Sequence, residues 1–308
     1  MHTVTSIISG IALLLSGIYF MRCGLQNILG SKLRQILVNL TMTPWRGLIV
    51  GTAASALMQS STAVSLITIG LVSADYLSFY QSLGIILGAN IGTCTTVQMM
   101  ALPLPDQYFT PLLLSSILIA IFVKKLRYIA MSLSGFFGIF IGIDLISNTL
   151  SQISELNLAL QYIAAGNSNP LYGIAGGILI TVILQSSSAA TALLMVLATG
   201  GVIDLTTALY VVYGNNIGSC ISSLIIGAAT PLAAKRVAAS HIILNIAGVL
   251  LFLPITSTVA FIIEKLVSDF PGQIALAHTG FNLLSSLIVL PFTKQYAKFI
   301  VFLVPEKN

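Results

Sequence analysis

The sequence predicts an all-α integral membrane protein of two inverted-topology repeats, each with a re-entrant helical hairpin, and about seven full spans. Composition is the first basis, since 56% of the 308 residues are hydrophobic and only 7% are charged, with a mean hydropathy of +1.01. Soluble domains carry about a quarter charged residues. The second basis is a repeated polar phrase, and the third is the distribution of basic residues between apolar runs.

The polar phrase divides the chain into two homologous halves. Gln59-Ser60-Ser61-Thr62 returns as Gln185-Ser186-Ser187-Ser188, 126 positions later. Gly88-Ala89-Asn90-Ile91-Gly92-Thr93-Cys94 returns at the same offset as Gly214-Asn215-Asn216-Ile217-Gly218-Ser219-Cys220. We therefore predict one membrane repeat at 1–127 and a second at 128–308 that carries an additional C-terminal span.

Apolar runs and their interruptions place the expected helices in order. Full spans are expected at about 4–21, 80–101, 108–123, 128–147, 206–228, 236–254 and 274–292. A polar, interfacial segment is expected from 22 to 45, and a loop from 148 to 169. The hairpins are expected at about 47–75 and 172–200, with the polar phrases at their centres. Residues 255–270 could lie along the outer surface or dip into the membrane.

Loop charge gives the expected orientation. If both hairpins return to the side they entered, all basic residues but Lys265 fall on one face, which the positive-inside rule makes cytoplasmic. They are Arg22, Lys32, Arg34, Arg46, Lys124, Lys125, Arg127, Lys235, Arg236, Lys294, Lys298 and Lys307. The N-terminus is then outside and the C-terminus cytoplasmic. The halves are inverted, and the two hairpin tips meet near the midplane. The net charge of +5 reflects topology and is not a nucleic-acid signal.

Amide and hydroxyl side chains at membrane depth indicate a buried polar site. Irregular backbone survives there only inside protein or beside a water-filled cavity. A broken helix presents free N–H groups and a partial positive charge, which together with hydroxyls bind an oxyanion without Lys or Arg. The carbonyl, Gln, Ser and Thr oxygens could instead ligate sodium. A single phrase of this type would more often be packing glue between helices. Two copies at one offset favour a site and a transporter.

The two motifs together resemble the type II sodium–phosphate cotransporter family, which includes short bacterial members. The similarity runs from Gly10 to Asn282. It implies sodium-coupled transport of inorganic phosphate by alternating access, in a bacterial plasma (inner) membrane. The implied binding residues are Gln59, Ser60, Ser61, Thr62, Ser65, Gln185, Ser186, Ser187, Ser188 and Thr191. The implied supporting residues are Asn90, Thr93, Asn216, Ser219, Asn245 and Asn282.

Sodium, the expected coupling ion, would be held by Gln59, Ser61, Thr62, Gln185, Ser187 and Ser188. Three residues depart from the family pattern: Asn215 replaces a small residue, and Cys94 and Cys220 replace common hydroxyls. We expect no enzyme and no cofactor, because the predicted spans hold no carboxylate pair and the chain has only 3 His. The expected partners are phosphate, sodium and the bilayer. A homodimer is left open.

The alternative is an exporter or a transporter of another oxyanion, such as sulfate or arsenate. A purely structural membrane subunit would not need matched polar phrases at the centre of the bilayer. Sodium stoichiometry, electrogenicity, direction and the protonation state of phosphate are not encoded in any motif. A transport assay with sodium, pH and voltage controlled independently separates these alternatives.

Overall fold

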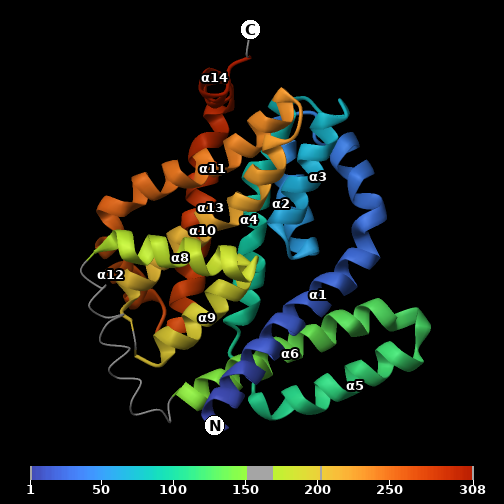
Figure 1. Ribbon diagram of the computed structural model, residues 1–308, viewed down its shortest axis with the longest axis vertical. Helices are drawn as coiled ribbons and strands as arrows, with labels where there is room; N and C mark the ends of the chain where they lie inside the picture. Colours follow the sequence, from blue (N-terminus) through green and yellow to red (C-terminus); the bar gives the residue numbers. More distant parts are fainter. Residues whose placement is uncertain (1, 151–168, 202, 307–308) are drawn as a thin grey trace.

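The computed structural model describes residues 2–150, 169–201 and 203–306, and the regular structure in these ranges is helical (Figure 1). Six helical stretches in the described chain are long and apolar enough to cross a membrane. They are Thr5–Ile28, Phe79–Met100, Lys124–Thr149, Leu205–Ala228, Leu232–Leu266 and Phe270–Leu303. The all-α, multi-pass membrane class is therefore confirmed. The N-terminal and C-terminal ends lie at opposite ends of the long axis (Figure 1).

The helices of the first half are α1 (His2–Leu40), α2 (Pro44–Met58), α3 (Ser61–Ser73), α4 (Phe79–Met100) and α5 (Phe109–Phe122). Those that follow are α6 (Arg127–Leu150), α8 (Pro170–Leu184), α9 (Ser187–Thr199), α10 (Leu205–Ala228), α11 (Leu232–Phe252), α12 (Thr256–Leu266), α13 (Phe270–Val289) and α14 (Thr293–Leu303). Short 3-10 turns precede α5 and α6, at Asp106–Tyr108 and Lys124–Leu126, and two more, at Leu253–Ile255 and Leu290–Phe292, precede α12 and α14.

Two helices of the first half differ in length from those expected. The helix expected to end at residue 21 continues to Leu40 as α1, and its apolar, membrane-length stretch runs from Thr5 to Ile28. Leu33 and Leu37, one turn apart, are buried in a core of first-half helices and α11, and hold this continuation in place. The expected span at 108–123 is α5, whose 14 residues extend ~21 Å, short of the ~30 Å hydrocarbon core.

The second half follows the expected order more closely. The helices α10, α11 and α13 lie at the expected spans at 206–228, 236–254 and 274–292, although α11 and α13 end two and three residues earlier. The segment at 255–270, left open by the sequence, contains the helix α12. Most of the expected loop at 148–169 lies outside the described residues.

Glycines let helix pairs approach closely at matching places in the two halves. A Cβ atom added at Gly88 of α4 would collide with the carbonyl oxygen of Leu48 of α2. A Cβ atom added at Gly214 of α10 would collide with the carbonyl oxygen of Ile174 of α8. Both pairs of residues are 126 positions apart, so α2 packs on α4 as α8 packs on α10. Small residues at such crossings are typical of helix packing in membranes.

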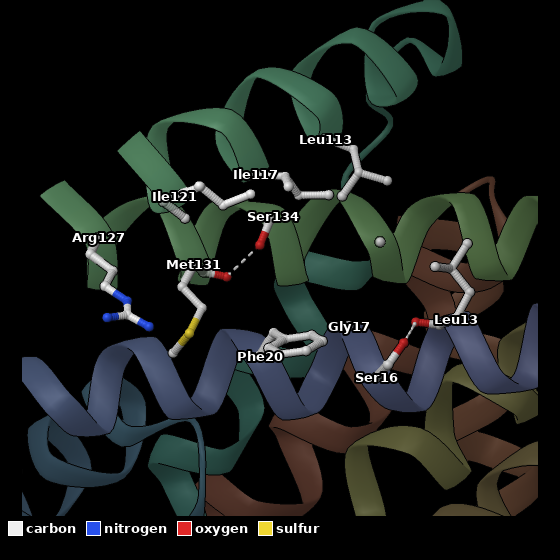
Figure 2. Close-up of a pocket in the computed structure, with 12 residues that line it drawn as sticks. Leu13, Ser16, Gly17, Phe20, Leu113, Ile117, Ile121, Arg127, Met131 and Ser134 are labelled. Atoms are coloured by element: carbon white, nitrogen blue, oxygen red, sulfur yellow. Dashed lines mark hydrogen bonds between the residues drawn. The ribbon is translucent and has the colours of Figure 1, made fainter. Parts of the chain in front are cut away.

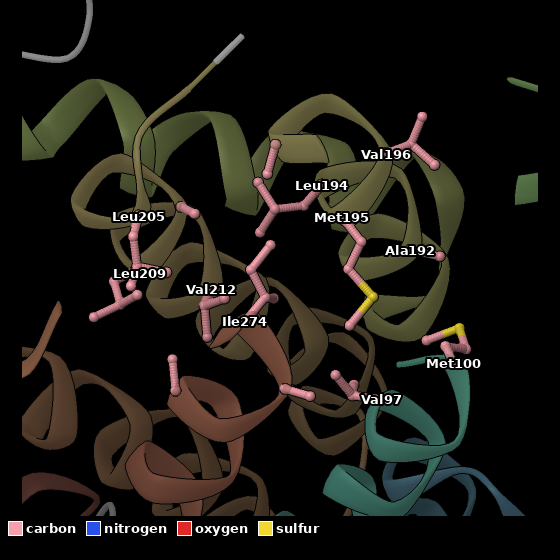
Figure 3. Packing of buried hydrophobic residues seen from close by; sticks show 14 of the residues in the cluster. Val97, Met100, Ala192, Leu194, Met195, Val196, Leu205, Leu209, Val212 and Ile274 are labelled. Carbon is pink, nitrogen blue, oxygen red and sulfur yellow. The ribbon is translucent and has the colours of Figure 1, made fainter. Parts of the chain in front are cut away.

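The largest buried core joins the second polar segment to both halves. Val97 and Met100 of α4, Met195 of α9, Val212 of α10 and Ile274 of α13 meet in it (Figure 3). These apolar contacts fix α9 against helices from the first half and from the end of the chain. The polar N-terminal end of α9 is therefore held at a defined place.

Candidate functional site

Each polar phrase breaks a helix at a glutamine in the left-handed conformation. Gln59 has φ 51° and ψ 31°, and Gln185 has φ 51° and ψ 27°. Residues other than glycine rarely adopt positive φ, so the same conformation at matching positions is a specific feature. The next residue caps the new helix: Ser60 Oγ accepts from the Ala63 N–H (3.2 Å), and Ser186 Oγ accepts from the Ala189 N–H (3.3 Å).

The helices before the two breaks also begin alike. Thr43 and Asn169 are N-caps, and each is followed by a proline at the first helical position, Pro44 and Pro170. Proline is favoured there because its missing N–H group has no intrahelical partner to lose. The result is two helix–break–helix units, α2–α3 and α8–α9, with short helices of 13 to 15 residues.

The two breaks line a common cavity of about 220 Å³. Eight of the predicted binding residues and one supporting residue contribute to its wall: Gln59, Ser60, Ser61, Thr62, Gln185, Ser186, Ser187, Ser188 and Thr93. Ser65 and Thr191, the remaining predicted binding residues, are buried one helical turn further on and are not part of the wall. The first helical turns of α3 and α9 therefore face the same small space.

A basic side chain that the sequence placed in a loop also lines this cavity. Arg22, in the middle of α1, donates from Nε to the carbonyl oxygen of Gln59 (2.9 Å) and from an Nη atom to Ser188 Oγ (3.2 Å). The expectation of a site without Lys or Arg is therefore wrong. It failed because α1 does not end at residue 21, so Arg22 stays at the level of the two breaks.

Behind the first break, a polar network connects α3, α4, α11 and α10. Ser65 Oγ contacts His241 Nδ1 (3.4 Å), and His241 Nε2 contacts Asn90 Oδ1 (3.0 Å). Asn90 donates from Nδ2 to Asn245 Oδ1 (3.3 Å), and Asn245 donates to Cys220 Sγ (3.1 Å). The His-x-x-x-Asn pair of α11 thus forms a seam behind the first break. The described residues contain no cluster of His, Cys, Asp or Glu that could hold a metal.

The second break is supported by a residue that the sequence analysis did not select. Asn215 accepts from Thr181 Oγ1 and donates to Thr191 Oγ1, at 3.1 Å in both cases, and so connects α8, α10 and α9. The predicted supports Asn216 and Ser219 bond to backbone carbonyls of their own helix. The exchange of a small residue for Asn at 215 was visible in the sequence, but its partners were not.

Asn282, the last predicted support, donates from Nδ2 to the carbonyl of His278 (3.0 Å) in its own helix α13. Its Oδ1 atom is buried and has no hydrogen-bond partner among the described residues. The same holds for His278 Nδ1. Two polar atoms on this face of α13 are therefore left without hydrogen bonds among the described residues.

Three buried side-chain oxygens, on α2, on its C-cap residue and on the facing helix α4, lack hydrogen-bond partners. Ser55 Oγ, Gln59 Oε1 and Thr96 Oγ1 have no hydrogen-bond partner among the described residues. Ser55 lies one turn before Gln59 on α2 and faces α4, since a Cβ atom added at Gly92 would lie 2.6 Å from its Cβ. Gln59 Nε2 in turn donates to Thr95 Oγ1 of α4 (3.3 Å), next to Thr96.

The matching positions of the second half are satisfied. Thr181, 126 residues after Ser55, donates to Asn215. Ser222, 126 residues after Thr96, donates to Gln185 Oε1 (3.0 Å), and Gln185 is the counterpart of Gln59. The second half has one unpaired buried hydroxyl of its own, on Ser223, whose first-half counterpart is Val97. Unpaired buried polar atoms are rare and costly, so the difference at the three matched positions needs a physical reason.

This arrangement is that of a multi-pass membrane protein with a small polar cavity between two interrupted helices. The class is refined by comparison with known families. A model of the Na+/Pi-cotransporter family matches the chain twice, over residues 13–148 and 149–285. The chain therefore belongs to the Na+/Pi-cotransporter family, which is a family of transporters, and both halves carry the family's pattern.

Similar curated proteins support this membership. "Uncharacterized protein YqeW" of Bacillus subtilis is 31% identical over 294 residues, which cover 95% of each chain. "Putative inorganic phosphate export protein YjbB" of Escherichia coli is 27% identical over 311 residues, and this chain spans 57% of its length. "Sodium-dependent phosphate transport protein 2A" of Rattus norvegicus is 36% identical over 59 residues, 19% of this chain and 9% of the rat protein. No solved structure matches the chain.

Proposed function

We propose that the protein is a sodium-coupled secondary transporter of inorganic phosphate, with the phosphate site in the cavity between the two breaks. The observation that carries the proposal is the convergence of two helix N-termini and Arg22 on one space of about 220 Å³. At ~30 Å³ for each water molecule, this space has room for a tetrahedral oxyanion together with a few waters.

The electrostatics of the cavity favour an anion. The first N–H groups of a helix lack intrahelical partners, and a helix N-terminus carries about half a positive charge. The cavity receives two such ends, those of α3 and α9, with the hydroxyls of Ser61 and Ser187 as further donors. Arg22 adds a full charge and a planar set of donors that matches phosphate oxygens.

The empty site remains tolerable because Arg22 has internal partners. A charged side chain at membrane depth is costly unless it is paired or solvated. The break leaves the carbonyl oxygen of Gln59 at the negative C-terminal end of α2, where it accepts from Arg22. Arg22 can then exchange this carbonyl and Ser188 for phosphate oxygens when the anion arrives.

Sodium is assigned to the first break. Sodium prefers hard oxygen ligands, and Ser55, Gln59 and Thr96 supply three buried oxygens without partners. Of the ligands expected from the sequence, Gln59 fits best, whereas Gln185 Oε1 already accepts from Ser222. Ser61, Thr62, Ser187 and Ser188 remain candidate ligands beside the anion. Because Gln59 holds Arg22 with its backbone and sodium with its side chain, occupancy by sodium fixes the position of the arginine.

The transport cycle rests on inverted halves with re-entrant units. The helices flanking each break have 13 to 15 residues and reach ~20–23 Å, too short for the ~30 Å core. If both units return to the side they entered and α5 crosses the membrane, the basic residues gather on the cytoplasmic side, apart from Lys265 and the cavity residue Arg22. Alternating access then follows from the movement of the halves around a fixed midplane site.

Uptake of labelled phosphate into proteoliposomes tests the proposal. A sodium gradient should drive accumulation, and a potassium gradient of the same size should not. Equal uptake under both gradients would refute the coupling. An excess of unlabelled sulfate or arsenate identifies the anion, and reversing the gradient tests export, the activity in the name of the Escherichia coli relative.

The sodium assignment has its own matched test. Thr96→Val removes an unpaired hydroxyl at the first break, and Ser222→Ala removes the bonded hydroxyl at the matching place of the second. We expect Thr96→Val to raise the sodium concentration for half-maximal uptake several-fold, with little change for Ser222→Ala. The reverse order of effects would place the cation at the second break.

A further inference from the structure

An apolar groove of about 550 Å³ runs between α1 and α5, with α6 as its floor (Figure 2). Leu13, Phe20, Ile117 and Met131 are among the side chains that line it. It belongs to neither break and shares no lining residue with the polar cavity. Its shape follows from packing, because α1 and α5 both pack on α6.

The interior of the groove offers no free hydroxyl. Ser16 Oγ donates to the carbonyl of Leu13 (3.1 Å), and Ser134 Oγ donates to the carbonyl of Met131 (2.8 Å) (Figure 2). Both hydroxyls are therefore satisfied by their own helices. The groove wall suits a hydrocarbon chain better than a polar solute.

A cationic group stands at one end. Arg127 lies at the mouth, whereas Leu13 and Leu113 lie at the other end (Figure 2). Lys124 and Lys125 lie three and two residues before it, in the turn before α6, and all three side chains are exposed. One positive charge at the end of a hydrocarbon-lined groove, with two more in the preceding turn, is complementary to an anionic headgroup attached to an acyl chain.

The length of the groove matches one leaflet. Arg127 and Gly138 bound its floor on α6 and are 11 residues apart, which is ~16 Å along a helix. Half of the ~30 Å hydrocarbon core is ~15 Å. A headgroup at Arg127 would lie at the membrane surface, and its acyl chain would reach the midplane.

We propose that the groove between α1 and α5 binds one anionic phospholipid, with its phosphate on Arg127 and an acyl chain along α6. The site does not depend on phosphate transport. It is predicted to select lipids by headgroup charge, which an ordinary lipid-facing surface does not do. Phosphatidylglycerol is the anionic probe, and phosphatidylcholine is the uncharged reference.

Quenching of a single tryptophan by brominated lipids measures this selectivity. The chain has one Trp, at position 45, so Trp45→Phe gives a silent background. Phe20→Trp places the reporter in the groove, and Leu250→Trp places a control on an exposed part of α11. We expect the full-length protein in vesicles to prefer brominated phosphatidylglycerol several-fold at the groove reporter and to show no preference at the control.

Two substitutions in the Phe20→Trp background locate the two parts of the lipid. Arg127→Gln should lower the preference by about fivefold, the contribution expected of one arginine near an anionic surface, and leave quenching by brominated phosphatidylcholine unchanged. Gly138→Leu should reduce quenching by both lipids. A Cβ atom there meets nothing closer than Gly17 Cα at 3.6 Å, so the side chain can enter the groove without displacing backbone.

Equal quenching by both brominated lipids at the groove reporter would overturn the proposal. So would a preference that survives Arg127→Gln. Absence of quenching by either lipid, with crosslinking between copies through Ile117→Cys, would instead assign the groove to a second copy of the chain. Because Arg127 is exposed, the Arg127→Gln variant should fold. It keeps the test decisive even if Gly138→Leu fails to fold.

Discussion

Replacing Arg22 with glutamine should weaken phosphate binding strongly. The substitution removes a full charge and the donors that now reach the Gln59 carbonyl (2.9 Å) and Ser188 Oγ (3.2 Å). A hydrogen bond to a charged group contributes ~1.5–3 kcal/mol, which corresponds to a ~10- to 150-fold higher dissociation constant. Arg22→Lys keeps the charge without the rigid planar donors, so we expect an intermediate loss.

The measurement is phosphate binding by titration calorimetry at saturating sodium, combined with uptake in proteoliposomes. Arg46→Gln is the matched control, because Arg46 is exposed at the start of α2 and does not line the cavity. It should bind phosphate like the unmodified protein. If Arg22→Gln binds phosphate with unchanged affinity, the placement of the anion in this cavity is wrong.

Three further substitutions test the scaffold of the site. Ser186→Ala removes the cap of α9 and should lower stability by ~0.5–2 kcal/mol and weaken phosphate binding. Unchanged stability in melting experiments and unchanged phosphate affinity in titrations would contradict the role of the cap. Asn215→Ala leaves the hydroxyl groups on either side without their shared partner and should lower the free energy of unfolding by ~1–3 kcal/mol, measured by denaturation in detergent. Gly214→Ala meets the Ile174 carbonyl and should destabilise by ~1–3 kcal/mol, whereas Gly176→Ala, with nothing within 4 Å, should be neutral or stabilising; similar melting temperatures for both would contradict the close packing of α8 on α10.

The positions of the two breaks could be predicted from the sequence because their cause is local. A run of short polar residues favours capping over helix continuation, and Ser60 and Ser186 are N-caps in both halves. The second copy of the polar phrase, at a fixed offset, made a chance occurrence of such a run improbable. That both breaks line one cavity could be expected only after the charge of the loops had suggested how the halves are oriented.

Arg22 was missed because its position depends on packing. A basic residue after an apolar run usually marks the membrane edge, but α1 continues because Leu33 and Leu37 are buried against other first-half helices and α11. The repeat gives no help. The first helices of the two halves match at an offset of 125, as Gly10 and Gly17 match Gly135 and Gly142, and the residue that corresponds to Arg22 is Ser147. The spacing of four between Leu33 and Leu37 was the available signal for a longer α1. It places both leucines on one face of a helix, which a hydropathy average does not detect.

The supporting residues were predicted unevenly for a related reason. Asn90 and Asn245 reach across to other helices, whereas Asn216 bonds within its own helix and Asn215 performs the bridging. Two adjacent asparagines on a helix point about 100° apart, so only the rotation of α10 decides which one faces α8 and α9. That rotation is set by packing at Gly214 and cannot be derived from the motif.

The two left-handed glutamines share a backbone conformation and differ in surroundings. The Gln59 residue is 5% exposed and therefore buried, whereas Gln185 is exposed. In a carrier made of related halves, an exchange of these two environments would generate a conformation facing the opposite solution. That second conformation would bury Gln185 and hydrate Gln59. The exposure of the two glutamines would therefore indicate the side of the membrane to which the cavity is open.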